Sequence, residues 1–237
     1  MISKTQKNIS YIVFGLVGVI ILLTAGFHSN IIKLPYVVRM SSQYAMNLSD
    51  NRELVGSSHN IFVGKVIKQE GTQISNKIPY TLFSVEIIAN IKGNLHGTVT
   101  IRQSGGYKDG ILYIETGDSG NAVSEKTKQS NSDKYILQSG SIYLFATRGP
   151  SKEGYYSISA PPYDSKLISD DITLSLMQLS EIAKNDDRVK AMKIAYPDEV
   201  LMDADIAHNR TLNSFSSLPV EEQERIKAEV EQMKAGR

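Results

Sequence analysis

Apolar residues run without a charged side chain from Tyr11 to Phe27. At 1.5 Å rise per helical residue, a run of about 17–19 residues spans roughly 26–28 Å, close to the hydrocarbon thickness of a bilayer. Tyr11, Phe14, Leu22 and Phe27 are then among the side chains in the membrane. The pattern therefore predicts a transmembrane helix or uncleaved signal anchor over residues 11–27.

Two other interpretations of this run stay open. A cleaved secretory signal is compatible with the small residues of Leu23-Thr24-Ala25, although the run is longer than the usual apolar core of a signal. A buried helix of a soluble protein is normally apolar on one face only. The charges flanking the run slightly favour residues 1–10 in the cytoplasm. We expect a single-pass membrane protein with its bulk extracytoplasmic, or a secreted protein if the run is cleaved.

The middle of the chain shows the short alternating pattern of β-strands. Mixed polar residues at 28–50 suggest a stalk, and 52–57 a short helical turn. From Tyr80 to Ile91, apolar residues recur at every second position, so one face of that strand is buried. Short strands separated by glycine-rich turns predict an antiparallel barrel or sandwich over 51–163. The expected strands are 60–70 with a bulge at Gly64, 80–91, 98–103 ending at Gly105-Gly106, 110–116, 141–147 and 154–159.

Polar residues at 117–134 form a stretch too long for an ordinary loop, and we expect a flexible insertion there. After Pro161-Pro162 the apolar spacing becomes helical. Residues 164–237 are therefore predicted to be a helical C-terminal extension. Its expected helices cover 170–184, with Ser169 as N-cap, then 188–195, 198–208 and 220–234.

Several strand segments carry a family resemblance. They include Phe62-Val63-Gly64-Lys65-Val66, residues 80–93, residues 98–106, residues 140–145 and Gly154-Tyr155-Tyr156. Together they resemble OB-fold domains of the tissue-inhibitor-of-metalloproteinase and netrin-module type, as in uncharacterised bacterial cell-surface proteins. The resemblance covers residues 50–160 and implies an OB-like barrel in a cell-surface setting. The animal inhibitors chelate zinc through an N-terminal cysteine, which this chain lacks, so that mechanism does not transfer.

These patterns together give an α+β fold class. It consists of an N-terminal transmembrane helix, a small antiparallel OB-like β-barrel and a helical C-terminal extension.

Composition narrows the function classes. The chain has no cysteine, which excludes disulfides, thiolate zinc sites and cysteine nucleophiles. Its net charge of +1 gives no global attraction to nucleic acid. Residues 164–237 hold 10 Lys/Arg against 15 Asp/Glu, so they carry −5 and the remainder +6. The acidic extension is either a solvated surface or a segment that docks on the basic barrel.

Two short motifs suggest chemistry without completing a site. Residues 117–120 read GDSG, like the serine of trypsin-like proteases, but no histidine stands in that family's context. Asp203, Asp205 and His208 lack the further ligands that a metal site needs. We therefore expect no catalytic residue, no metal and no cofactor.

A binding surface is the stronger hypothesis, because barrels of this kind bind ligands through aromatic side chains on exposed strands. The alternative is that the same tyrosines are ordinary, half-buried strand residues. The expected partners are the bilayer, through residues 11–27, and an envelope protein or glycan, rather than nucleic acid. The candidate residues are Tyr107, Tyr113, Tyr143, Tyr155 and Tyr156 with Arg102 and Lys108.

The sequence thus favours a membrane-anchored, non-enzymatic protein with a binding or assembly role. A cleaved, secreted binding protein is one alternative. The other is an envelope hydrolase that uses carboxylates, with Glu86 or Glu115 paired with Asp109.

Overall fold

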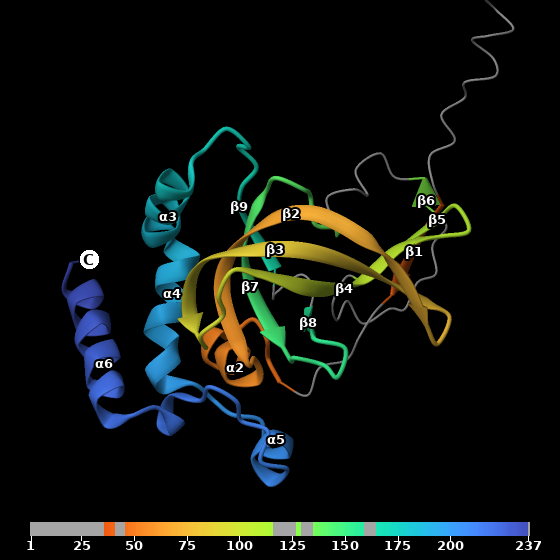
Figure 1. Cartoon of the computed structure of the whole chain (residues 1–237). Helices are drawn as coiled ribbons and strands as arrows, with labels where there is room; N and C mark the ends of the chain where they lie inside the picture. Colours follow the sequence, from red (N-terminus) through yellow and green to blue (C-terminus); the bar gives the residue numbers. More distant parts are fainter. Residues whose placement is uncertain (1–35, 41–45, 116–126, 129–134, 159–164, 237) are drawn as a thin grey trace, which may run out of the picture. The chain divides into compact units, whose positions relative to one another are not determined.

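In the computed structural model of the 237-residue chain, Tyr36–Arg237 form a unit separate from Met1–Pro35. This unit is mixed α and β, with a nine-stranded sheet, one short helix near its start and the other helices in its C-terminal third (Figure 1). The predicted membrane segment, with Tyr11, Phe14, Leu22 and Phe27, lies outside the described residues. The structure describes residues 36–40, 46–115, 127–128, 135–158 and 165–236. Within these ranges, no helix combines the length and the apolarity needed to cross a bilayer.

Five strands close into a ring. Around it the order is β3, β2, β7, β8 and β4, and β4 pairs again with β3. The β4–β8 pair is parallel and the other four are antiparallel, so the prediction of a wholly antiparallel barrel is wrong for this pair. A closed ring leaves these strands without free edges. The strands are β2 (Asn60–Ser75), β3 (Ile78–Lys92), β4 (Thr98–Lys108), β7 (Ile142–Arg148) and β8 (Tyr155–Ile158).

Four further strands extend the sheet, and three of them correct the sequence analysis. β1 (Tyr36–Met40) pairs with β5 (Ile111–Glu115) and buries Val37 completely, so the stalk predicted over 28–50 is wrong for Tyr36–Met40. β6 (Thr127–Lys128) pairs with β1, within the predicted insertion at 117–134. β9 (Ser165–Ser169) pairs with β7, so the C-terminal extension begins as a strand and not as a helix.

The predicted end of the strand at Gly105-Gly106 is also wrong. β4 continues to Lys108, and the chain reverses at Asp109-Gly110, where both φ angles are positive (52° and 73°). Such a pair forms the tight turn that suits a hairpin. A Cβ on Gly106 would lie 2.3 Å from Thr81 Oγ1, so the glycines permit a close crossing of strands.

The barrel interior confirms the alternation predicted for residues 80–91 only in its first part, because Ile88, Ala89 and Ile91 all pack against the apolar cluster outside the barrel. Phe83 and Val85 point inward from β3, and Phe62 of β2 stacks on Phe145 of β7 with ring centroids 5.1 Å apart. The register of β2 shifts between Val63 and Gly64, which confirms the predicted irregularity there. This core also contains Val37, Val66, Ile101, Leu112, Ile114, Ile136, Leu137, Tyr143 and Ile158.

The helices follow the predicted order, with shifted boundaries. The helix predicted over 170–184 begins only after Ser175, whose hydroxyl caps it together with Gln178 in a capping box. The predicted 198–208 helix shortens to five residues. The elements are α2 (Asn51–Ser57), α3 (Leu176–Asn185), α4 (Asp187–Ala195), η2 (Tyr196–Asp198), α5 (Asp203–Ala207), η3 (Phe215–Ser217) and α6 (Val220–Ala235).

A second apolar cluster joins the helices to the barrel. Ile61 and Val63 of β2 pack with Leu54 of α2, Leu179 of α3 and Met192 of α4. Since Phe62 and Val66 fill the barrel instead, β2 is buried on both faces over its first half. This explains why β2 begins as a continuous apolar run and does not alternate.

Candidate binding site

An arginine lies between two tyrosine rings on the outer face of the barrel. The Arg102 guanidinium carbon is 4.0 Å from the ring centroid of Tyr80 and 4.8 Å from that of Tyr155. Nη1 of Arg102 also donates to the Tyr155 hydroxyl at 2.5 Å. All three side chains are partly exposed. We call Tyr80, Arg102 and Tyr155 the tyrosine–arginine cluster.

Strand register explains why this cluster forms. Phe83 and Val85 of β3 and Ile101 of β4 fill the barrel, so the alternate residues Tyr80 and Arg102 point outward. Tyr155 opens β8, which runs parallel to β4 with Thr100 opposite Tyr155. Two consecutive strands, β3 and β4, and the distant strand β8 therefore place the three side chains together.

The chemistry of the cluster is that of an oriented cation. Stacking between aromatic faces holds the guanidinium plane in place, which reduces the entropy lost when a ligand binds. Beside it, the pKa of Glu153 is held below its usual value, first by hydrogen bonds from its own backbone amide and from Ser151, and also by Arg102. A guanidinium fixed in this way is suited to a planar carboxylate.

The residues that the sequence nominated do not form one surface. Arg102 and Tyr155 come together, whereas Tyr107 and Lys108 lie at the far end of β4 and Tyr113 faces Gly106 from β5. Tyr80 was missed, although it shares the outward face of its strand with Leu82, Ser84 and Glu86. Tyr156 packs partly against the barrel core.

The prediction that Tyr143 belongs to an exposed binding surface is wrong, because this residue is only 8% exposed and belongs to the core. Its hydroxyl accepts a hydrogen bond from the Gln138 amide at 3.0 Å, and burial raises the pKa of its phenol. It packs against Phe145 with ring centroids 5.8 Å apart. Tyr143 therefore supports the fold and does not line an exposed site.

No protein-family model and no curated protein matches this chain.

A buried ion pair connects the barrel to the C-terminal region. Lys92, the last residue of β3, donates from Nζ to Glu199 Oε2 at 2.5 Å and to the Val55 carbonyl at 2.8 Å. The two charged side chains are 1% and 5% exposed. Glu199 Oε1 accepts from the Phe215 amide at 2.6 Å. Burial lowers the pKa of Lys92 and Glu199 opposes that shift, but an enclosed amine of this kind is not accessible to a substrate.

A second ion pair lies nearby. Nη2 of Arg148 donates to both carboxylate oxygens of Asp205, at 2.8 Å each. Arg210 Nε lies 3.4 Å from Oδ1 of the same carboxylate. Arg148 also donates to the Ser57 carbonyl. Asp205, weighed above as a metal ligand, is thus held by arginines, and its acidic segment docks on the basic barrel. In the ranges that the structure covers, no three His, Cys, Asp or Glu side chains gather as a metal site.

The carboxylates considered for a hydrolase lie far apart. Glu86 pairs with Thr98 at the start of β4, while Asp109 follows its end. At about 3.3 Å per residue, β4 has a contour length of about 35 Å. Glu115 lies at the opposite end of β5 from Asp109. The structure therefore contradicts both proposed pairs. The GDSG segment at 117–120 lies outside the described residues.

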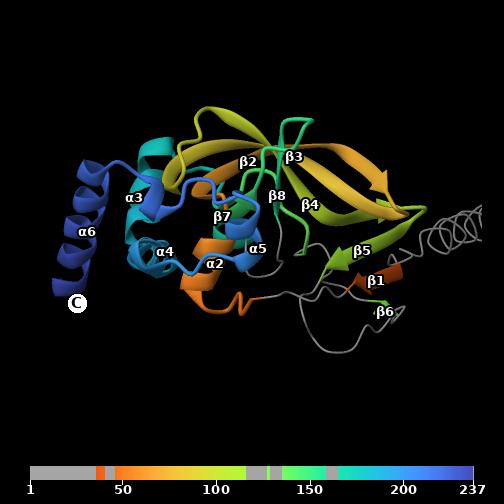
Figure 2. The same cartoon turned by 90° about the horizontal axis from the view of Figure 1, so that it is seen from below.

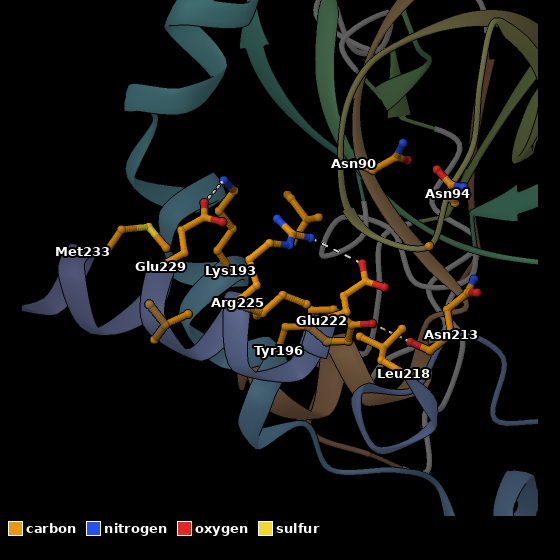
Figure 3. A pocket seen from close by; sticks show the side chains of 14 residues that line it. Asn90, Asn94, Lys193, Tyr196, Asn213, Leu218, Glu222, Arg225, Glu229 and Met233 are labelled. Atoms are coloured by element: carbon orange, nitrogen blue, oxygen red, sulfur yellow. Dashed lines mark hydrogen bonds and ion pairs between the residues drawn. The ribbon is translucent and has the colours of Figure 1, made fainter. Parts of the chain in front are cut away.

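A pocket of about 360 Å³ separates α6 from the end of the barrel (Figure 3). Lys193 pairs with Glu229 across it at 2.6 Å, and Arg225 pairs with Glu222 at 3.3 Å. The Tyr196 hydroxyl donates to a backbone carbonyl at 2.7 Å, and burial raises the pKa of that phenol. The Lys193–Glu229 pair joins α4 to α6, whereas the Arg225–Glu222 pair lies within α6 itself, so only the first of them holds α6 in place.

His59 gives the fold a predicted pH dependence. Nδ1 lies 3.1 Å from the Gly149 amide nitrogen and 3.3 Å from the Gly149 carbonyl oxygen, and Nε2 is buried and has no partner among the described residues. Burial, then Arg148, lowers the pKa of His59 from its ordinary value of 6.5. The unfolded chain therefore binds the proton more readily. Stability from the neutral ring is full above pH 6.5 and is lost as the pH falls towards the folded-state pKa.

His59→Asn keeps an acceptor for the Gly149 amide. We expect this variant to lose less folding stability than the parent as the pH falls. Urea unfolding at pH about 7.5 and about 5 measures it as the change in midpoint between the two conditions. His96→Asn, at an exposed position, controls for the removal of a histidine as such. If the midpoint of His59→Asn changes between the two pH values as much as that of the parent, His59 is not the cause of the pH dependence.

Proposed function

We propose that the protein is a membrane-anchored extracytoplasmic binding protein, and that it holds its partner at the tyrosine–arginine cluster. The observation that carries this proposal is the Arg102 guanidinium between the Tyr80 and Tyr155 rings on a partly exposed strand face. Arginine and tyrosine are also the residue types that most often dominate binding energy at interfaces. The apolar run at residues 11–27 supports the anchor.

The topology supports an OB-like barrel. Its five strands close in the order first, second, third, fifth, fourth and back to the first. In OB folds the ligand lies over the second and third strands and beside the loop between the fourth and fifth. Here those strands are β3 and β4, and that loop precedes Tyr155. The tyrosine–arginine cluster therefore occupies the face that such a barrel uses for binding.

The cluster favours a carboxylate-bearing partner, either an envelope protein or an acidic envelope glycan. The guanidinium recognises the carboxylate, and the tyrosine hydroxyls and ring edges contact the surrounding atoms. The sequence offers no general attraction to nucleic acid, because its net charge is +1.

Site-specific crosslinking on intact cells tests the proposal. A photo-crosslinking residue replaces Ser104, which shares the outward face of β4 with Arg102, and a matched one replaces the exposed Ala228 on α6. We expect an adduct from position 104 and none from 228. In parallel, the full chain is sedimented with purified envelope glycan. No adduct at 104 together with no co-sedimentation would overturn the proposal.

Substitution of Arg102 provides the quantitative prediction. Arg102→Ala should lower the adduct or sedimented fraction at least about tenfold, as for an interface hot spot. Tyr155→Phe should have a smaller effect, because it keeps the ring and loses one hydrogen bond. Lys152→Ala removes an exposed charge from the neighbouring loop and is the matched control. Equal binding by Arg102→Ala and Lys152→Ala would place the site elsewhere.

A further inference from the structure

Two hairpin turns and the start of β1 meet at one end of the barrel. Lys108 Nζ, beside the β4–β5 turn, donates to the Lys77 carbonyl in the β2–β3 turn at 3.0 Å, so the two turns lie side by side. Tyr36, the first residue of β1, pairs with Ile111 directly after the β4–β5 turn. Figure 2 shows these elements at one end of the sheet and α6 at the other.

Aromatic, aliphatic and basic side chains are exposed at this end. Tyr36 is 50% exposed, Ile74 52% and Tyr107 48%. Lys77 is also exposed, and Lys108 partly so, while Asp109 is an acidic residue in the same turns. We call Tyr36, Ile74, Lys77, Tyr107 and Lys108 the hairpin end.

The hairpin end is tethered closely to the predicted anchor. Nine residue steps separate Phe27, where the apolar run ends, from Tyr36. Fully extended, they span at most about 32 Å. Tyr36 is the point at which the described unit begins, so this tether limits how far the hairpin end can lie from a bilayer that holds residues 11–27.

We infer that the hairpin end rests against the phospholipid headgroups of the bilayer that holds the anchor. Tyrosine is enriched at the membrane interface, where its ring contacts apolar atoms and its hydroxyl stays hydrated. Ile74 adds an apolar contact at the tip of the longer hairpin. Lys77 and Lys108 attract anionic headgroups. This inference rests on the membrane anchoring in the proposed function, and it gives the barrel a fixed orientation on the membrane.

Single-site labelling of the full chain tests the inference. Because the chain has no cysteine, Ser75→Cys next to the hairpin tip and Ala228→Cys on α6 each create one attachment site for a polarity-sensitive fluorophore. Both residues are exposed. The labelled chains are reconstituted into vesicles of phosphatidylcholine and phosphatidylglycerol that contain a lipid with a headgroup quencher.

We expect the label at position 75 to shift its emission to shorter wavelength and to lose most of its intensity to the quencher, and the label at 228 to do neither. Lys77→Glu with Lys108→Glu should restore much of that intensity, as should high salt, which screens the attraction. If the chain floats with the vesicles but both labels respond alike, the inference fails and the anchor stands. If the chain does not float with the vesicles, both the anchor and the inference fail.

Discussion

Lys92→Met is expected to lower the free energy of unfolding by about 3–5 kcal/mol, the largest stability effect predicted for this protein. The substitution keeps an apolar chain in the space but leaves the Glu199 carboxylate buried without its cation. Glu199 is 5% exposed, so water does not replace the lost partner. The Val55 carbonyl also loses its donor. Urea unfolding of the full chain in mild detergent, followed by circular dichroism, measures the change.

Two controls separate burial of the pair from loss of a lysine. Lys227→Met breaks an exposed pair with Glu224 and is expected to cost no more than about 1 kcal/mol. Lys92→Met combined with Glu199→Gln removes both charges and should recover part of the loss. A Lys92→Met protein as stable as Lys227→Met would show that the buried pair contributes little.

The two ion pairs also specify how the C-terminal region sits on the barrel. Lys92 and Arg148 end two strands of the ring, and their partners Glu199 and Asp205 lie beyond α4. Apolar contacts alone would allow the C-terminal region to shift along the barrel. A buried charge does not, because it is costly unless it lies next to its partner. Two acidic residues of the negatively charged segment 164–237 thus pair with basic residues of the barrel. This agrees with the interpretation that the segment docks on the barrel, rather than with a wholly solvated surface.

The sequence could not identify Lys92 as buried. It precedes Gly93-Asn94, so its surroundings in the chain are those of an exposed turn. Its partner is 107 residues away, and no local pattern links the two. For the same reason β1, β6 and β9 were missed. Each is short, and the partners of β1 and β6 are distant in the chain.

The alternation of apolar and polar residues predicted the strands well, but it did not predict which strand residues are exposed. It identifies which residues of β3 and β4 share a face, and so it placed Arg102 outward. It does not say what covers a strand from outside. Tyr143 of β7 was therefore assigned to a binding surface, although β7 is buried on both faces by the barrel core and by the helices. Tyr80 was missed because its importance depends on β4 and β8 lying beside it.

Gly56→Ala is expected to destabilise the protein by about 1–3 kcal/mol or more, opposite in sign to the usual effect in a helix. In an exposed helix interior, the same change stabilises by about 1 kcal/mol. Here a Cβ on Gly56 would lie 1.9 Å from the carbonyl oxygen of Val200 and 2.4 Å from its carbonyl carbon. These are backbone atoms, so no side-chain rotation relieves the overlap.

The overlap forces α2 and the segment after η2 apart at the point where they are hydrogen-bonded. The Val200 amide donates to the Arg52 carbonyl at 3.1 Å, and the neighbouring Glu199 holds Lys92. Gly56→Ala should therefore weaken the buried ion pair as well, and its effect should be less than additive with that of Lys92→Met. Ser57→Ala adds no new atom in the same helix and is the control, expected within about 1 kcal/mol. A Gly56→Ala protein more stable than the parent would mean that α2 does not pack against Val200.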